Sequence, residues 1–297
     1  MSGISFWTGL AKRCLSCQQP FEQGWNCPRC GAGPQVRDDV LLFAPDVAFS
    51  HEGFDPAYFQ RLASYDDWYF WFAARRELLL WFATIAGTDV RAYLELGCGT
   101  GGVLAAFANR HPQWNVAGAE VLIEGLRHAQ ARVPRAFVFQ ADGGSLPFDQ
   151  SIDMIGAFDV LEHIDDDRQT LQKLQQALRV GGLLLLTVPQ HPALWSSSDE
   201  LAHHKRRYTR RDLVEKLRDN GFEIVHETSF AMLLLPLMAI SRRWKRRDPW
   251  REFEISRRLN SLFLLVCRIE LAMIRYGVPM PFGGSLAVLA RKSGCAP

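Results

Sequence analysis

Long apolar runs are missing from this sequence of 297 residues. No stretch reaches the ~18–20 consecutive apolar residues that a membrane-spanning helix needs. Residues 1–10 also lack the charged start and the long apolar run of a secretory signal. No long polar tract suggests general disorder. From these absences we expect a folded, cytoplasmic protein.

The chain also lacks a strong excess of either charge. Its formal net charge of +2 indicates neither an acidic nor a basic partner. Hydrophobic residues make up 48% of the composition, which is enough to fill a sizeable core. The length allows one large α/β domain with a small appendage.

Cysteine is sparse, but four of the seven cysteines stand in two C-x-x-C pairs, Cys14 with Cys17 and Cys27 with Cys30. Two such pairs separated by a short loop predict a structural zinc ribbon, in which each pair offers two thiolates to one tetrahedral ion. A segment of about forty residues buries little core, so the metal would supply the folding energy, typically ~10–16 kcal/mol. Two disulfides would instead need an oxidising compartment, which nothing in the sequence indicates.

A glycine-rich turn at residues 93–102 organises the rest of the chain. An apolar run carries Glu95 and leads into a turn with glycines at positions 97, 99 and 101, and a helical pattern follows at residues 103–108. Glycine lets the backbone turn sharply and approach a bound molecule closely. The amides at the start of the next helix suit a carboxylate or a phosphate.

Strands and helices alternate after this turn. This alternation predicts a doubly wound, mostly parallel sheet with its binding sites at the carboxyl ends of the strands. The expected strands cover residues 116–120, 137–141, 152–158 and 183–189, and the expected helices cover residues 123–131 and 166–178.

The order of these motifs resembles the class I S-adenosylmethionine (SAM)-dependent methyltransferases over residues 66–292, most closely the branch with the ubiquinone-biosynthesis enzymes. The resemblance implies a Rossmann-like, mostly parallel, seven-stranded α/β sheet that residues 281–290 complete. It implies SAM as the cofactor, with the glycine turn at its methionine part, Glu120 at the ribose hydroxyls and Asp142 at the adenine. The whole set that it implies for cofactor binding is Arg75, Glu95, Gly97, Cys98, Gly99, Gly101, Glu120, Asp142, Gly143 and Asp159.

Arg75 enters this set through a helix expected over residues 66–85, with Asp66 and Asp67 in its first turn and its end near Gly87. The resemblance places a W-x-x-x-R pattern over the cofactor, which Trp71 and Arg75 fit. An arginine there can pair with the SAM carboxylate. The rival interpretation is a solvated helix face.

Residues 195–209 resemble a family loop of the form D-x-x-x-x-H-x-R-x-Y that covers the substrate pocket. The resemblance implies that Trp195, Arg206 and Tyr208 contact the substrate. A helix should follow at residues 210–220, with Thr209 as its N-cap and Gly221 as its stop.

Two histidines are candidates for catalysis. His204, five residues after Asp199, could take a proton from a hydroxyl nucleophile, because its unperturbed pKa lies near neutrality. Its alternative role is to hold the loop in place through hydrogen bonds. His163, in a turn after the fourth strand, is the second candidate, with a structural or pocket-wall role as its alternative.

The last third of the chain has an unusual pattern. Residues 230–240 are almost wholly apolar, residues 241–247 form a basic run that contains Trp244, and residues 259–268 have a helical pattern. An apolar helix beside a basic run favours contact with anionic lipid. A core-facing helix with a solvated basic loop, or a phosphate-binding patch, fits the same residues.

The sequence therefore predicts a zinc ribbon at residues 1–45, a linker with helices at 46–90, and a methyltransferase domain at 91–297 with an insertion at about 230–275. The expected reaction transfers a methyl group to an O, N or C nucleophile of a small or lipid-linked metabolite, at the inner face of the membrane or in the cytoplasm. The alternatives are an RNA methyltransferase that uses the ribbon and the basic run, and a catalytically silent SAM-binding protein. The mixed charges of the ribbon favour a structural role over RNA binding.

Overall fold

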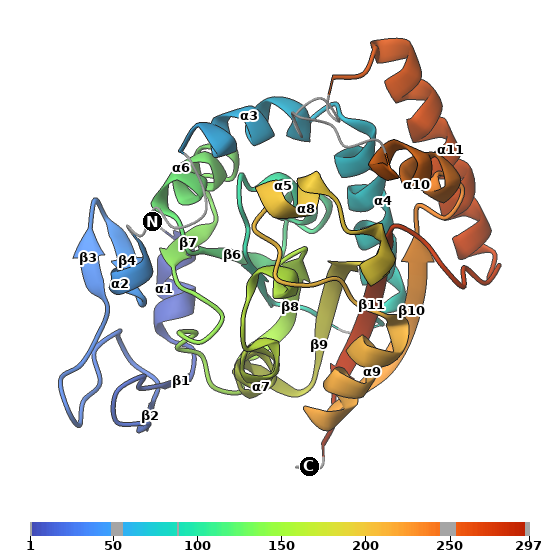
Figure 1. The fold of residues 1–297 in the computed structure, drawn as a ribbon. Coiled ribbons are helices and arrows are strands. Elements are labelled where there is room, and N and C mark those ends of the chain that lie inside the picture. Colours follow the sequence, from blue (N-terminus) through green and yellow to red (C-terminus); the bar gives the residue numbers. More distant parts are fainter. Residues whose placement is uncertain (1, 49–55, 88, 244–253, 295–297) are drawn as a thin grey trace.

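A large sheet with helices on both faces forms the centre of the computed structural model, which describes residues 2–48, 56–87, 89–243 and 254–294 (Figure 1). Its strands are β3 (Gln35–Arg37), β4 (Val40–Leu42), β5 (Ala92–Leu96), β6 (Asn115–Glu120), β7 (Phe137–Gln140), β8 (Ile152–Phe158), β9 (Leu178–Pro189), β10 (Phe222–Phe230) and β11 (Ser285–Lys292). They lie in the order β10-β11-β9-β8-β5-β6-β7-β4-β3. The strands from β9 to β4 are parallel, whereas β11 is antiparallel to both of its neighbours.

The predicted doubly wound fold is confirmed, but the sheet has two more strands than the seven expected. The hairpin β3–β4 adds them at the edge, where Leu42 pairs with Gln140 of β7. The end of the segment expected to form the ribbon is thus part of the main sheet. β1 (Lys12–Arg13) and β2 (Pro20–Phe21) form a separate two-stranded sheet.

Helices cover the sheet because its strands are apolar on both faces. In β9, Leu183 and Leu185 face one core and Leu184 and Leu186 face the other, and all four are fully buried. One core includes side chains of α4 (Phe70–Ile85), α5 (Gly102–Arg110), α6 (Ile123–Arg132) and α11 (Arg257–Arg275). The other includes side chains of α1 (Ser2–Thr8), α7 (Asp167–Ala177) and α9 (Arg210–Asp219). The remaining helices are α2 (Pro45–Ala48), α3 (Pro56–Asp66), α8 (Ser197–Leu201), α10 (Leu235–Arg243) and two short 3-10 turns, η1 (Leu161–His163) and η2 (Pro192–Leu194).

The helix expected to open at Asp66 does not begin there. α3 ends at Asp66, and α4 begins at Phe70. The Asp66 carboxylate accepts hydrogen bonds from Thr100 Oγ1 (3.0 Å), Arg76 Nη1 (2.9 Å) and Arg132 Nη1 (3.0 Å). This acid therefore braces the glycine turn instead of complementing a helix dipole.

Other local predictions hold. The Thr209 hydroxyl caps α9 by accepting a hydrogen bond from the Asp212 N–H at 3.2 Å, and Gly221 follows the helix with a φ of +76°. The start of β9 was predicted wrongly, because the strand begins at Leu178 and not at residue 183.

The N-terminal segment packs firmly against the main sheet. The Trp7 side chain is 1% exposed and lies against the rings of Phe137 and Phe148, with centroid distances of 6.0 and 5.6 Å. Trp25, between the two cysteine pairs, stacks on Phe137 at 5.3 Å. The ribbon and the methyltransferase fold thus share one core.

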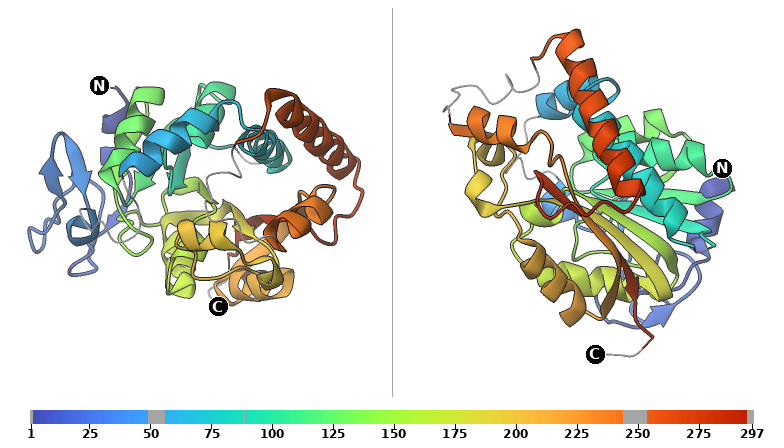
Figure 2. Two further views of the ribbon diagram at one scale, coloured as in Figure 1. Left: turned by 45° about the horizontal axis from the view of Figure 1, so that its top comes forward. Right: turned by 90° about the vertical axis from the view of Figure 1, so that its right-hand side faces the viewer.

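The C-terminal insertion lies at the opposite end of the sheet from β3, with α11 on the outside of α4 (Figures 1 and 2). Asn260 fixes α11 there, because its side chain accepts from Phe70 N–H (2.8 Å) and donates to the Trp68 carbonyl (2.9 Å). Trp244 and residues 245–247 of the basic run lie outside the described residues. No helix in the described ranges is both long and apolar enough to cross a membrane.

Candidate active site

The glycine turn lies between β5 and α5, at the carboxyl ends of the parallel strands. Gly97, Gly99 and Gly101 have φ values of +68°, +50° and +77°, a region that disfavours residues with a Cβ. A Cβ at Gly101 would lie 2.8 Å from the Ala129 Cα, so this glycine is needed for α5 to pack on α6. A Cβ at Gly99 would meet no atom within 4 Å, so the space in front of Gly99 is open to a ligand.

Glu120 stands at the end of β6 and is tied to this turn. Its Oε2 accepts a hydrogen bond from the Gly99 N–H (2.9 Å), and its Oε1 accepts from the N–H groups of Val121 (2.8 Å) and Leu122 (3.3 Å). Burial raises the pKa of Glu120, while these three backbone donors act in the opposite direction. The turn and the acid are therefore brought together, as the sequence predicted.

Two members of the predicted cofactor set have side chains that point into the core. The Glu95 carboxylate accepts a hydrogen bond from the Tyr93 hydroxyl (3.0 Å), and burial raises the pKa of Glu95 to about 8. The Cys98 side chain is 5% exposed and lies against Gly118, and burial raises the pKa of its thiol. Cys98 therefore contributes only its backbone to the glycine turn, while its side chain packs in the core.

Asp142 follows β7, two residues beyond the strand. Its Oδ1 accepts a hydrogen bond from the Gly144 N–H (2.9 Å), which shapes the loop around it. Gly143 lies against α7, since a Cβ there would be 2.6 Å from the Thr170 Oγ1.

Gln140, which the sequence analysis missed, joins this region to the N-terminal segment. Its fully buried amide donates to the carbonyls of Ala44 (2.9 Å) and Val121 (3.1 Å), and its Oε1 accepts from the Ala44 N–H (3.0 Å). One side chain thus connects the end of the ribbon with the residue after Glu120. Only the polar residue in an otherwise apolar strand hints at this role.

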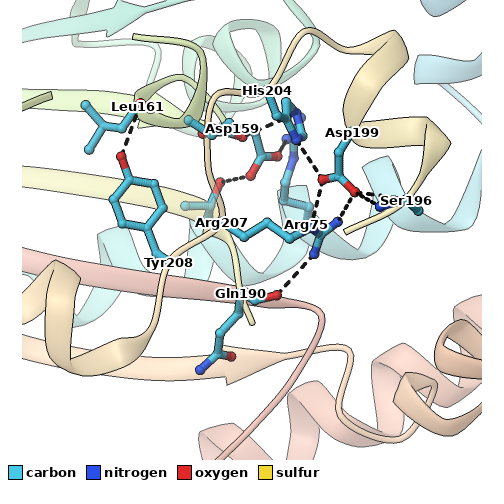
Figure 3. Close-up of polar contacts among 11 residues, drawn as sticks. Arg75, Asp159, Leu161, Gln190, Ser196, Asp199, His204, Arg207 and Tyr208 are labelled. Carbon is cyan, nitrogen blue, oxygen red and sulfur yellow. Dashed lines mark hydrogen bonds and ion pairs between the residues drawn. The ribbon is translucent and has the colours of Figure 1, made fainter. Parts of the chain in front are cut away.

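Arg75 reaches from α4 to the end of β8. Its guanidinium pairs with the Asp159 carboxylate (Figure 3). It also lies 5.6 Å from the centre of the Phe72 ring. The other oxygen of Asp159 accepts from the Thr187 hydroxyl at 3.0 Å. Asp159 has a φ of +55°, so the backbone at the end of the strand is held in an uncommon conformation. Arg75 is therefore directed toward the strand ends and is not a solvated helix residue.

His204 is oriented by a buried acid (Figure 3). Its Nδ1–H donates to the Asp199 Oδ1 at 2.9 Å. The Asp199 side chain is fully buried and also accepts from Arg207 Nε (2.7 Å), Arg207 Nη2 (3.1 Å) and Ser196 N–H (2.8 Å). Arg207 was not singled out from the sequence, although it lies between two residues of the loop motif that were.

The Nε2 of His204 points toward a buried glutamic acid. It lies 3.9 Å from the Glu162 Oε1, and the ring of His163 stands edge-on to the His204 ring at a centroid distance of 4.8 Å. Glu162 is fully buried, and neither of its carboxylate oxygens has a hydrogen-bond partner among the described residues. Burial raises the pKa of Glu162 well above its ordinary value and lowers the pKa of His163 to about 4.

The three residues of the 195–209 loop that were predicted to contact the substrate differ in exposure. The Tyr208 side chain is fully buried, and its hydroxyl donates to Asp167 (2.7 Å) and lies 3.1 Å from the Leu161 carbonyl. Arg206 donates to the Asp165 carbonyl (2.7 Å) and pairs with Asp167 (3.3 Å). Both side chains therefore fasten the loop to the start of α7. Trp195, at 40% exposure, is the loop residue of the predicted set that remains open to a ligand.

A glycine turn, an acid at the next strand end and a doubly wound sheet form a nucleotide-type site, and comparison with known proteins agrees. A sequence family described as "Methyltransferase domain" matches residues 64–227, more than half of the chain. The chain belongs to the SAM-dependent methyltransferases. The match begins just before Asp66 and ends in β10.

Individual relatives are similar over part of their length. A probable SAM-dependent methyltransferase of Mycolicibacterium smegmatis is 32% identical over 47% of this chain and 53% of its own length. A trans-aconitate 2-methyltransferase of Azoarcus sp. is 32% identical over 46% of this chain and 50% of its own. The chain thus spans about half the length of these curated relatives.

Solved methyltransferase structures share the fold. A Haloferax volcanii methyltransferase, solved in complex with the Trm112 methyltransferase activator, has a TM-score of 0.53 and 18% identity, over 81% of this chain and 96% of its own. A Thermotoga maritima SAM-dependent methyltransferase has a TM-score of 0.53 and 16% identity, over 80% and 97%.

Proposed function

We propose that this methyltransferase moves the methyl group of SAM to an O, N or C nucleophile of a small or lipid-linked metabolite. The observation that carries the proposal is the polar group at the ends of β8 and β9, where Asp199 orients His204 beside Glu162 and close to the Arg75–Asp159 pair. The name of the Azoarcus relative, which describes a small tricarboxylic acceptor, favours a small metabolite over a macromolecule.

The cofactor would lie along the carboxyl ends of β5, β6 and β7. The open space at Gly99 would admit its methionine part, the Glu120 carboxylate would accept from the ribose hydroxyls, and Asp142 would face the adenine. Arg75 would exchange Asp159 for the carboxylate of the cofactor, since a guanidinium binds either anion through the same donors. SAM supplies an electrophilic methyl group when it is bound.

The enzyme's main contribution is then alignment of the acceptor with that methyl group. His204 is the candidate base for an acceptor hydroxyl, because Asp199 holds the proton on Nδ1 and leaves the Nε2 lone pair to take one. Glu162, whose pKa burial raises well above its ordinary value, would face the same nitrogen at 3.9 Å. Trp195 would contact the acceptor from the loop, whereas Arg206 and Tyr208 would support the loop from behind.

Calorimetric titration with S-adenosylhomocysteine tests the cofactor part of this proposal. We expect micromolar binding, about −8 kcal/mol, which Glu120→Ala abolishes and which His204→Asn leaves intact. Absence of binding by the wild-type chain would overturn the cofactor site. A survey of candidate acceptors with radiolabelled SAM then tests His204, whose replacement should stop transfer to hydroxyl acceptors.

We also propose that the four cysteines hold a structural zinc ion. The Sγ atoms of Cys14 and Cys30 are 3.6 Å apart, as are those of Cys17 and Cys27, and all four lie within 4.8 Å of one another. Four thiolates at this separation suit one tetrahedral ion with Zn–S bonds of about 2.3 Å.

The ribbon would act as a clamp on the cofactor loop at residues 141–147. Before this loop, Trp25 stacks on Phe137. At its end, the Arg13 N–H donates to the carbonyl of Pro147, the last residue of the loop (2.7 Å), and the Arg13 guanidinium pairs with Asp149 (2.7 Å). Because the ribbon uses these groups for internal contacts, we favour a structural role over RNA binding.

A further inference from the structure

The outer face of α11 is apolar although nothing in the described structure covers it. Its inner face, which includes Cys267 and Leu271, is buried against the body of the protein, and Phe263 packs on Phe70 of α4. On the outside, Leu262 and Leu265 are 53% and 55% exposed. This stripe continues at helical spacing through Ile269, Ala272 and Tyr276, of which Ile269 is 50% and Tyr276 89% exposed. α11 is thus apolar on two sides, and only one of them has a protein partner within the described residues.

α10 extends the apolar surface. Leu237 and Ile240 of α10 are 48% and 60% exposed, and Leu233, in the turn before the helix, is 39% exposed. Glu270 of α11 holds the start of this segment, because its buried carboxylate accepts from the N–H groups of Met232 (3.1 Å) and Leu233 (2.9 Å). A buried, hydrogen-bonded acid therefore links α11 to the turn before α10.

The exposed charges on these helices have one sign. Arg257, Arg258 and Arg275 are exposed at the two ends of α11, and Arg268 pairs with Glu77 of α4. Within the described ranges of α10 and α11, the sole acidic residue is the buried Glu270. Within the described residues, the exposed surface of α10 and α11 thus combines large apolar side chains with arginines and has no acidic side chain, while the exposed Glu254 precedes α11 by three residues.

We propose that α11 docks on an anionic lipid bilayer through the face formed by Leu262, Leu265 and Ile269. A helix with an apolar stripe and a basic border lies in the interface, where the apolar side chains enter the acyl region and the arginines meet lipid phosphates. A second copy of the chain fits this face less well, because self-association would bring the arginines of both copies together without an acidic partner on either helix. This surface is separate from the SAM site, so the proposal does not depend on the proposed reaction.

Docking at this face would present the methyltransferase fold to the bilayer in one orientation. α11 is joined to the start of α4 through Asn260, and α4 carries Arg75 to the strand ends. The membrane would therefore be held beside the helix that borders the active site. A lipid-linked acceptor would gain from this arrangement, whereas a water-soluble acceptor would not need it.

Co-sedimentation of the full chain with vesicles tests the proposal. We expect binding to vesicles of phosphatidylcholine mixed with phosphatidylglycerol, little binding to phosphatidylcholine alone, and release by high salt. The double variant Leu262→Asp with Leu265→Asp should weaken binding at least about tenfold, because charges enter the apolar interface poorly. The matched control is Val36→Asp with Val180→Asp, at two positions that are 67% and 53% exposed elsewhere on the molecule, and it should bind normally.

Charge is tested separately. Arg257→Glu with Arg258→Glu should also weaken binding, whereas Arg211→Glu with Arg218→Glu on α9, the same change in net charge, should have a smaller effect. Unchanged affinity for S-adenosylhomocysteine would establish that each variant is folded. Equal binding to neutral and anionic vesicles, or undiminished binding by the Leu262/Leu265 variant, would overturn the proposal. So would a dimer in sedimentation velocity that this variant dissolves, since that would assign the face to a second copy.

Discussion

Replacing Trp25 with alanine separates the ribbon's effect on the cofactor site from its effect on stability. The Trp25 ring meets Phe137 at 5.3 Å, Phe43 at 5.7 Å and Phe148 at 6.3 Å. At ~0.5–1.5 kcal/mol for each aromatic pair beyond area burial, the loss is about 1.5–4.5 kcal/mol. Phe137 and Phe148 lie on either side of the loop that carries Asp142. The lost contacts are therefore those that hold the two ends of this loop against the ribbon.

The consequence for binding follows from the fraction of molecules in which the loop is ordered. If the ordered fraction falls to about a tenth, the apparent dissociation constant rises about tenfold. We therefore expect Trp25→Ala to weaken S-adenosylhomocysteine binding about tenfold, or ~1.4 kcal/mol, as measured by calorimetric titration. Thermal unfolding of the same samples gives the accompanying loss of stability.

Trp114→Ala is the matched control. Trp114 is 6% exposed, stacks on His111 at 3.9 Å and precedes the amino end of β6, away from the cofactor loop. This variant should lose stability and keep its affinity for S-adenosylhomocysteine. If Trp25→Ala binds S-adenosylhomocysteine as tightly as the wild type, or if both variants lose affinity equally, the proposal that the ribbon holds the cofactor loop is refuted.

Three further predictions concern other parts of the molecule. Asp199→Asn should lower kcat about 10²–10³-fold with little change in cofactor affinity, because His204 loses the charge that stabilises its protonated form; kinetics close to those of the wild type would show that His204 is not the base. Burial raises the pKa of Glu95 from 4.5 to about 8. The Glu95 carboxyl therefore contributes fully to the free energy of unfolding below pH 4.5, and this contribution is lost as the pH rises through about 8. Glu95→Gln, which keeps a group for Tyr93 to bond, should remove this fall, and a thermal-unfolding profile against pH that stays parallel to that of the wild type would contradict the assignment. Cys27→Ser should lose the bound zinc by elemental analysis, together with protection of residues 1–45 from proteolysis; full zinc content in the variant would exclude Cys27 as a ligand.

Local patterns predicted the parts of the site that depend on short-range geometry. The glycine turn and the Thr209 cap follow from residues within a few positions of each other, and both are where the sequence placed them. The resemblance added Glu120, whose place beside Gly99 follows from the parallel pairing of β5 and β6.

Contacts between distant segments were beyond such patterns. Asp66 follows the rule for acids at a helix start, yet it bonds Thr100 and Arg132, which are brought near only when the sheet is formed. The pairing of β4 with β7 could not be predicted for the same reason, because the sequence of a three-residue apolar strand does not indicate which strand it pairs with. Arg207 could not be distinguished from the adjacent arginine, because only the fold decides which of them is buried against Asp199.

The position of β11 has a consequence for the order of events during synthesis. This strand lies between β9 and β10, so β9 lacks one of its two neighbours until β11, which ends at Lys292, has left the ribosome. The parallel strands can pair earlier, but the sheet is completed only by the last strand of the described chain. Until then the apolar edge of β9 and the apolar segment at residues 230–240 are exposed together, which is the state in which such chains aggregate. A late strand thus leaves one edge of β9 unpaired while the segment between β9 and β11 is synthesised, and it gives chaperones a defined interval in which to act.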